Sequence, residues 1–191
     1  MKERLTILIT ALLISTLAAA SVPEQVDKTY SVAPKVPIEA YAFSLKDVRL
    51  LDGPFKKAMD IDAKYLLDLS PDRFMCMLRK QAGLEPKAEK YGGWEGRGLS
   101  GHVMGHYLSA CSMMYAASDD KRYLKRVNYL VDELAECQKA HGNGYVGGVP
   151  EAKRIFSEVA EGKIKAGKFS LNKGWVPWYN LHKLYQGLVD A

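Results

Sequence analysis

Helical periodicity dominates this 191-residue chain and most constrains its fold. The clearest case lies between Asp120 and Gly142, where apolar residues recur in steps of four, three, four and three, the spacing of one buried helix face. Ser100 can cap a helix at 102–118, and Asp119 or Asp120 can cap the next one. A partly alternating segment at 43–51 predicts one short strand. The sequence therefore predicts an all-α fold of helical hairpins, with helices over residues 55–69, 71–82, 102–118, 121–141, 150–161 and from 178 onward.

The connections between these helices differ in length, and the difference indicates where a site would lie. Short turns at 70–71 and 118–120 alternate with long aromatic loops at 85–99 and 142–178, the second of which contains the small helix. Every second connection in a stack of hairpins lies at the same end, so the two long loops should meet at the N-termini of helix 102–118 and of the last helix. Elaborate loops on a rigid scaffold are the usual place for a binding site. We expect a pocket with aromatic and polar side chains there.

Two histidines, His102 and His106, lie one helical turn apart and therefore share a helix face. This spacing can hold a metal ion, but the zinc-protease pattern needs a glutamate directly after the first histidine, and Val103 occupies that place. Hydrogen bonding to a sugar or another substrate, and plain packing, are the alternatives. Gly101 and Gly105 would let another backbone or a ligand approach the same face closely.

Aromatic and acidic residues in and beside the glycine-rich loops add further candidates. Trp94 and Glu95 lie within GGWEG at 92–96. An indole face stacks on the C–H face of a sugar ring, and a carboxylate binds sugar hydroxyls. Packing of Trp94 against a helix end is the alternative. Tyr145 lies in a similar loop at 142–148, and His182, near the start of the last helix, has three aromatic neighbours, Trp175, Trp178 and Tyr179.

Several function classes lack their sequence patterns in this chain. There is no phosphate-binding glycine loop with lysine, no dinucleotide-binding glycine pattern after a strand and no nucleophile-elbow serine pattern. The net charge is +5, but the basic residues are scattered among acids, so no nucleic-acid partner is expected. The three cysteines, Cys76, Cys111 and Cys137, fall in separate helical segments without metal-site spacing, and we interpret them as small core residues.

The N-terminus has the pattern of a secretory signal. A charged start at 2–4 precedes a mainly apolar run at 5–17, shorter than the ~20 residues that span a bilayer, and alanines at 18–20 offer a cleavage site. Residues 1–20 are therefore predicted to be a cleaved signal peptide, with an uncleaved anchor as the alternative. Residues 21–42, which include several prolines, are an expected extended leader. The mature chain would be periplasmic or extracellular, without a membrane partner.

Five motifs follow one another along the chain: LLDGPF at 50–55, GWE at 93–95, LSGHVMGHYLSA at 99–110, GNGY at 142–145 and YNLHK at 179–183. In this order they resemble the N-terminal part of the family 127 glycoside hydrolases, which are β-L-arabinofuranosidases related to family 146. The resemblance implies an (α/α)6 barrel and a retaining hydrolase that releases terminal L-arabinofuranose from plant glycans. Residues 43–191 would form the N-terminal part of that catalytic domain, truncated at the C-terminus, because the last helix stops in mid-pattern.

The resemblance places the family's catalytic groups later in the barrel. Full-length members use a cysteine thiolate held by zinc in a cluster of cysteines and a glutamate, with a second glutamate as acid/base, and the cysteines here do not match that cluster. No catalytic residue, metal ligand or cofactor is therefore assigned in this chain, which is expected to be inactive alone. The alternatives are a non-catalytic carbohydrate-binding protein, a relic of the same fold and a helical protein without a site. The expected carbohydrate-binding residues are His102, His106 and His182, followed by Trp94, Glu95 and Tyr145.

Overall fold

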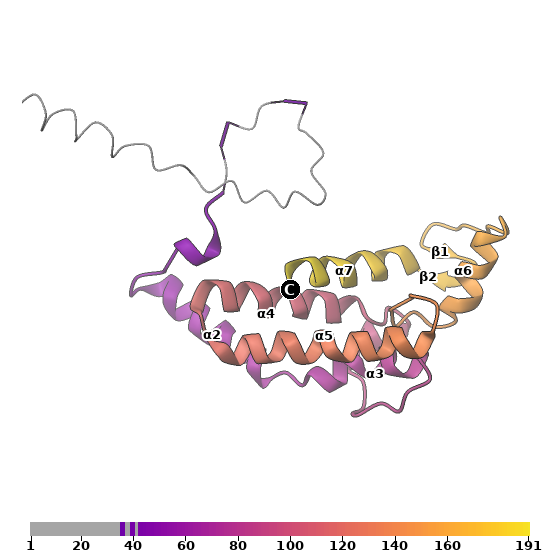
Figure 1. Cartoon of the computed structure of the whole chain (residues 1–191), viewed down its shortest axis with the longest axis horizontal. Helices are drawn as coiled ribbons and strands as arrows, with labels where there is room; N and C mark the ends of the chain where they lie inside the picture. Colours follow the sequence, from indigo (N-terminus) through magenta and orange to yellow (C-terminus); the bar gives the residue numbers. More distant parts are fainter. Residues whose placement is uncertain (1–34, 37–38, 41) are drawn as a thin grey trace, which may run out of the picture. The chain divides into compact units, whose positions relative to one another are not determined.

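The computed structural model describes residues 35–36, 39–40 and 42–191 (Figure 1). The chain divides into two units, Met1–Ala42 and Phe43–Ala191, and the helices and strands of the described part belong to the second. The predicted signal peptide at 1–20, and most of the predicted leader at 21–42, lie outside the described residues. Within the described part, none of the helices combines the length and the apolar character needed to cross a membrane.

The unit Phe43–Ala191 is mainly helical, as the periodicity predicts. Proline occupies a first-turn position of α2, α3 and α7, where its missing N–H costs no hydrogen bond. Asp120 caps α5 by accepting the backbone N–H of Arg122 at 2.9 Å, and Gly142 ends that helix in a left-handed conformation. The all-α prediction is confirmed. The helices are α2 (Pro54–Asp68), α3 (Pro71–Gln81), α4 (His102–Ser118), α5 (Lys121–His141), α6 (Ala152–Ala160) and α7 (Pro177–Asp190), with a short 3-10 turn, η3 (Glu95–Arg97), before α4.

The prediction of a strand at 43–51 is wrong. This segment contains a 3-10 turn, η2 (Leu45–Asp47), in which Ser44 accepts the N–H of Lys46 with its hydroxyl at 3.3 Å and that of Asp47 with its carbonyl at 2.9 Å. Serine caps such turns readily. A strand also needs a partner strand, and none pairs with this segment in the described part of the chain.

The loop expected at 162–177 contains a small hairpin that the sequence analysis missed. Strands β1 (Ser170–Leu171) and β2 (Gly174–Trp175) pair antiparallel, with Leu171 opposite Gly174. Asn172 and Lys173 join them, and both have positive φ angles, 47° and 68°, as a two-residue hairpin turn requires. Strands of two residues are too short to show the alternation by which sequence reveals a strand.

The core lies between α2, α3, α4, α5 and α7, with a smaller cluster beneath α6. All three cysteines are buried free thiols, and Cys111 and Cys137 belong to the main cluster, which confirms their interpretation as core residues. The smaller cluster joins α6 to the loop before it and to β1 through Val149, Ala152, Ile155 and Leu171. Fully buried side chains at the centre of the main cluster include Met75, Leu78, Met104, Leu108, Leu130 and Leu184.

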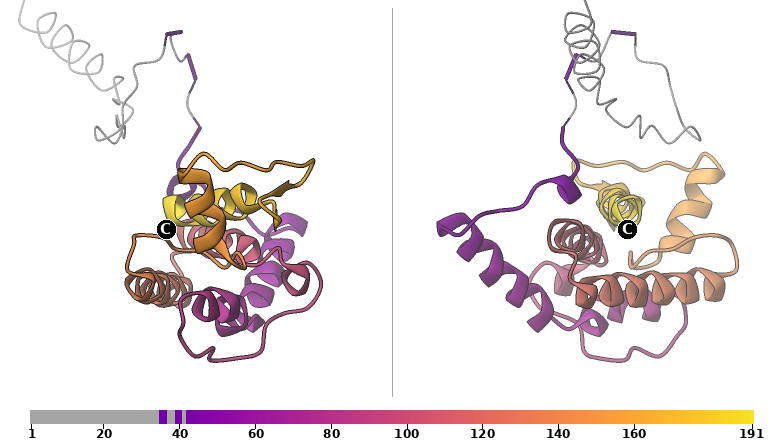
Figure 2. Two further views of the ribbon diagram at one scale, coloured as in Figure 1. Left: turned by 90° about the vertical axis from the view of Figure 1, so that its right-hand side faces the viewer. Right: turned by 60° about the vertical axis from the view of Figure 1, so that its left-hand side comes forward.

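Helices α4 and α7 pack directly against each other, and both begin at the same end of the unit (Figures 1 and 2). Their backbones approach each other closely at Gly105 and Gly187. A Cβ added at Gly105 would lie 2.6 Å from the Leu184 nitrogen and closer still to the Lys183 carbonyl, and one at Gly187 would lie 2.5 Å from the Gly105 oxygen. The sequence predicts a close approach of a backbone or a ligand at Gly105, and in the structure the backbone of α7 occupies this place.

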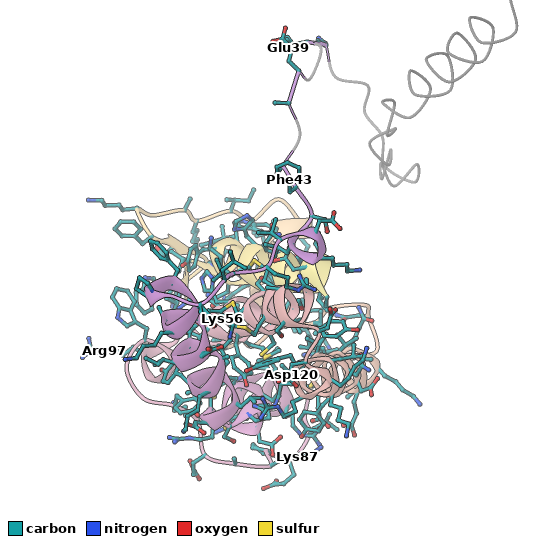
Figure 3. The ribbon with its side chains drawn as sticks, turned by 90° about the vertical axis from the view of Figure 1, so that its left-hand side faces the viewer. Glu39, Phe43, Lys56, Lys87, Arg97 and Asp120 are labelled. Atoms are coloured by element: carbon teal, nitrogen blue, oxygen red, sulfur yellow. The ribbon has the colours of Figure 1, made fainter. Side chains whose placement is uncertain are left out.

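A buried ionic network anchors the long loop after α3. The Arg79 guanidinium contacts the Glu133 and Glu136 carboxylates of α5, each at 2.7 Å, and donates to the Glu85 carbonyl at 2.8 Å. Lys87, labelled in Figure 3, forms a second ion pair with Glu133. Figure 3 views the end of the unit that lies opposite to the starts of α4 and α7. At this end, the turn at Asp120 joins α4 to α5. The network thus fixes the start of the loop that later carries Trp94.

Candidate functional site

A pocket of about 760 Å3 lies at the end of the unit where α4 and α7 begin, the end that the left view of Figure 2 faces. The first long loop contributes Trp94 and Leu99, and the second contributes residues around β2. The two loops touch through Trp94 and Trp175, whose rings are 5.7 Å apart between centroids and inclined by 19°. The predicted meeting of the two loops is therefore confirmed. The lining residues are Trp94, Leu99, His102, Phe169, Trp175, Val176 and Tyr179.

Aromatic rings form most of the wall of this pocket. Trp94 is 65% exposed, so it does not plug the end of a helix, which was the alternative interpretation. Phe169 and Tyr179 are exposed as well, and Tyr179 lies 5.8 Å from His102 between ring centroids. Exposed aromatic rings gathered around one hollow are costly to hydrate, and they offer flat faces to a ligand that has apolar C–H surfaces.

Glu95 has a different role from the one the sequence suggested. We expected its carboxylate to bind sugar hydroxyls, but the residue is only 6% exposed. One carboxylate oxygen accepts the backbone N–H of Gly101 at 3.0 Å, and the other accepts that of Val103 at 3.1 Å. Because both oxygens serve the unsatisfied N–H groups at the start of α4, Glu95 acts as the cap of this helix. Ser100, the expected cap, donates its hydroxyl to the Glu95 carbonyl instead.

The same carboxylate orients His102. The imidazole Nδ1 lies 3.1 Å from a Glu95 carboxylate oxygen and 2.6 Å from the Leu99 carbonyl oxygen. With two acceptors beside it, Nδ1 carries a proton, and Nε2 is the nitrogen left for a ligand. Burial lowers the pKa of His102, but the hydrogen bonds to Glu95 and Leu99 outweigh it, so the pKa is raised. His102 is thus held in one orientation at the pocket wall.

The structure brings His106 close to His102 but leaves His182 apart from the pocket. The rings of His102 and His106 are 6.1 Å apart between centroids, on the shared face that the spacing predicts. The side chain of His106 is exposed. Its pKa is lowered because neighbouring atoms displace part of its hydration, and because the charges of Lys183 and His102 disfavour its protonated form. His182 is exposed on α7 and is not among the residues that line the pocket. A single pocket shared by all three imidazoles is therefore not what the described residues form.

Tyr145 is also not among the residues that line the pocket. Its ring packs between His141, at 5.0 Å, and Phe156 of α6, at 5.8 Å, within the smaller hydrophobic cluster. Burial raises the pKa of its hydroxyl. The backbone of Gly148 lies against Ser100 and Gly101, which holds the chain after Tyr145 at the start of α4. Tyr145 positions this loop rather than lining the pocket.

The sequence profile of the family described as "Beta-L-arabinofuranosidase, GH127 catalytic domain" matches residues 47–191. This chain belongs to the family 127 glycoside hydrolases. No curated protein matches the chain. The match covers nearly the whole unit Phe43–Ala191, including the helices, both long loops and the pocket.

The zinc cluster expected for family 127 does not fit the described residues of this glycoside hydrolase chain. No group of three or more histidine, cysteine or acidic side chains is placed there to hold a metal ion. The cysteines lie on α3, α4 and α5, and burial raises the pKa of Cys111 and raises that of Cys137 to about 11. Zinc binds thiolates, and these surroundings favour the protonated thiol. No step of a reaction is therefore assigned to a metal here.

Sequence reasoning missed most of the wall that this family 127 chain builds from its second loop and the start of α7. Trp175 and Tyr179 were noted only as neighbours of His182, and Phe169 and Val176 were not singled out. A usable signal was present, because Asn172-Lys173-Gly174 between apolar residues is a hairpin-turn pattern. A hairpin there would have placed residues 169 and 175 on neighbouring strand ends.

Three histidines, His102, His106 and His141, should titrate in a distinctive order. We expect His102 to titrate above its ordinary value of 6.5, and His106 and His141 to titrate below theirs. The contribution of His102 to stability is then fully present below pH 6.5 and is lost as the pH rises through its raised pKa. The contributions of His106 and His141 have the opposite sign: they are fully present above pH 6.5 and are lost as the pH falls through their lowered pKa values. NMR titration of the imidazole resonances measures this order. In Glu95→Gln, the pKa of His102 should fall, and an unchanged value would contradict the assigned hydrogen bond.

Proposed function

We propose that this chain provides the sugar-binding wall of a β-L-arabinofuranosidase and holds a terminal L-arabinofuranose unit of a plant glycan in the pocket beside Trp94 and His102. Membership of family 127 supports a glycoside hydrolase. The observation that carries the finer proposal is the combination of an aromatic wall with one oriented imidazole. Export through the signal-like residues 1–20 is part of the same proposal.

The wall suits a sugar because a furanose ring has both apolar and polar surfaces. Its C–H faces can pack on the exposed rings of Trp94, Tyr179 and Phe169. Its hydroxyl groups need donors and acceptors, and the free Nε2 of His102 can accept a hydrogen bond when the ring is neutral and donate one when it is protonated. The buried Glu95 carboxylate keeps that nitrogen directed outward.

Further helices complete the hydrolase in this proposal, and the unit's surface supports that part of it. Large apolar side chains are exposed along α2 and α7, among them Phe55 at 79%, Ile61 at 64% and Val189 at 81%. Burying such groups gains roughly 25 cal/mol per Å2 of apolar surface, so faces like these favour packing against other helices. In this proposal, the chain binds the sugar, and the catalytic groups come from the rest of the complete catalytic domain.

Trp94→Ala should weaken binding of methyl β-L-arabinofuranoside about two- to tenfold, because one lost stacking face accounts for roughly 0.5–1.5 kcal/mol. Isothermal titration calorimetry of the full chain measures the affinity. Trp178→Ala is the matched control, since Trp178 is 58% exposed but packs on Phe156 outside the pocket. Equal losses in the two variants, or no saturable binding by the wild-type chain, would contradict the proposal.

A further inference from the structure

Val176 has a backbone conformation that valine strongly disfavours. Its φ and ψ angles are 38° and 52°, in the left-handed region, and it directly precedes Pro177. A side chain with a Cβ is strained there, a branched side chain more so, and a residue before proline normally has an extended backbone. Glycine or asparagine would occupy this position more easily. The valine is therefore held in place by its surroundings and at a cost in stability.

Two buried asparagines hold the chain on both sides of Val176. Asn180, 2% exposed, donates both its backbone and its side-chain N–H to the Val176 carbonyl, each at 3.2 Å. The N–H of Val176 donates to the Phe169 carbonyl at 2.9 Å. Asn172, also 2% exposed, ties the hairpin to α6 by donating to Glu158 at 2.6 Å. The hairpin and the first turn of α7 thus impose the left-handed turn.

This strained residue lines the pocket together with the aromatic residues Trp175 and Tyr179. We propose that Val176 is a specificity-determining residue, whose branched side chain limits the space beside Trp175 and Tyr179 so that a five-membered sugar ring packs against them and a six-membered ring does not. This inference rests on the proposed function. A glycine would satisfy the backbone but leave a gap in the wall. The valine side chain has few rotamers, so it sets a fixed boundary that a flexible residue would not provide.

The pair of variants Val176→Gly and Val176→Ala separates the side chain's function from its packing. Both remove the branched methyl groups, but only glycine also removes the backbone strain. We expect the glycine variant to melt above the alanine variant and no lower than the wild-type chain. We also expect it to bind methyl β-L-arabinofuranoside several-fold more weakly than wild type. A residue that merely packs would lose stability in both variants, and binding would follow stability.

Selectivity provides the decisive measurement. Calorimetric titration of the full chain with methyl β-L-arabinofuranoside and with methyl β-L-arabinopyranoside gives a ratio of affinities. In both Val176 variants this ratio should fall about tenfold relative to wild type, because a wider pocket admits the six-membered ring, and a size difference of this scale discriminates by one to two orders of magnitude. A wild-type chain that binds the furanoside, with an unchanged ratio in the variants, overturns the role of Val176 alone. A wild-type chain that binds neither sugar overturns the proposed function and this inference with it.

Discussion

Gly105→Ala should destabilise the protein by about 3 kcal/mol, although alanine is ordinarily the better helix former by about 1 kcal/mol. The added Cβ would lie 2.6 Å from the Leu184 nitrogen and closer still to the Lys183 carbonyl. These are backbone atoms of α7, which cannot rotate out of the way as the end of a side chain can. Helices α4 and α7 must therefore separate, and their buried contacts with Met104, Leu108 and Leu184 loosen. Chemical denaturation followed by circular dichroism measures the loss.

Gly92→Ala is the matched control for this variant. An added Cβ at Gly92 would meet nothing within 4 Å, and the residue has no positive φ angle. Its free energy of unfolding should stay within about 0.5 kcal/mol of the wild-type value. Gly105→Ala should also impair ligand binding, because the pocket takes His102 from α4 and Tyr179 from α7. If Gly105→Ala proved as stable as Gly92→Ala, the close helix approach would be wrong.

The parts of this fold that were predictable from sequence depend on interactions between near neighbours in the chain. The apolar stripe of α5, its cap at Asp120 and its end at Gly142 all involve residues within one helical turn of the feature that they specify. The meeting of the two long loops was predictable for another reason. It follows from the alternation of short and long connections, which constrains topology without any knowledge of side-chain contacts.

The unpredicted parts depend on where irregular segments fold back. Glu95 caps α4 across an irregular loop of six to eight residues, so no capping pattern marks it, and Ser100 had the expected spacing instead. Tyr145 and Trp94 lie in similar glycine-rich loops, yet one ring is packed under α6 and the other is exposed at the pocket. Glycine-rich sequence indicates that a loop can bend closely, but not toward which neighbour. His182 illustrates the same limit on a helix, because an aromatic neighbourhood in sequence includes both faces of α7.

Glu95→Ala should cost about 2–4 kcal/mol of stability and should also weaken sugar binding, because Glu95 both caps α4 and orients His102 in the pocket. Its carboxylate accepts the N–H groups of Gly101 and Val103 and lies beside His102 Nδ1. Alanine would leave two buried donors unsatisfied, each costing roughly 1–3 kcal/mol where water does not replace the lost acceptor. The His102 ring would lose its fixed orientation at the same time.

The comparison of Glu95→Ala with Glu95→Gln and Glu89→Ala tests both consequences. Glutamine keeps one acceptor oxygen and the side-chain shape, so Glu95→Gln should lose roughly half as much stability while still misdirecting His102. Glu89 is an exposed residue of the same loop, and its alanine variant should remain within about 0.5 kcal/mol of wild type. Denaturation and calorimetric titration on one set of samples give stability and affinity together. Wild-type stability in Glu95→Ala would remove the capping role, and wild-type affinity in a destabilised Glu95→Ala would show that the orientation of His102 does not matter for the sugar.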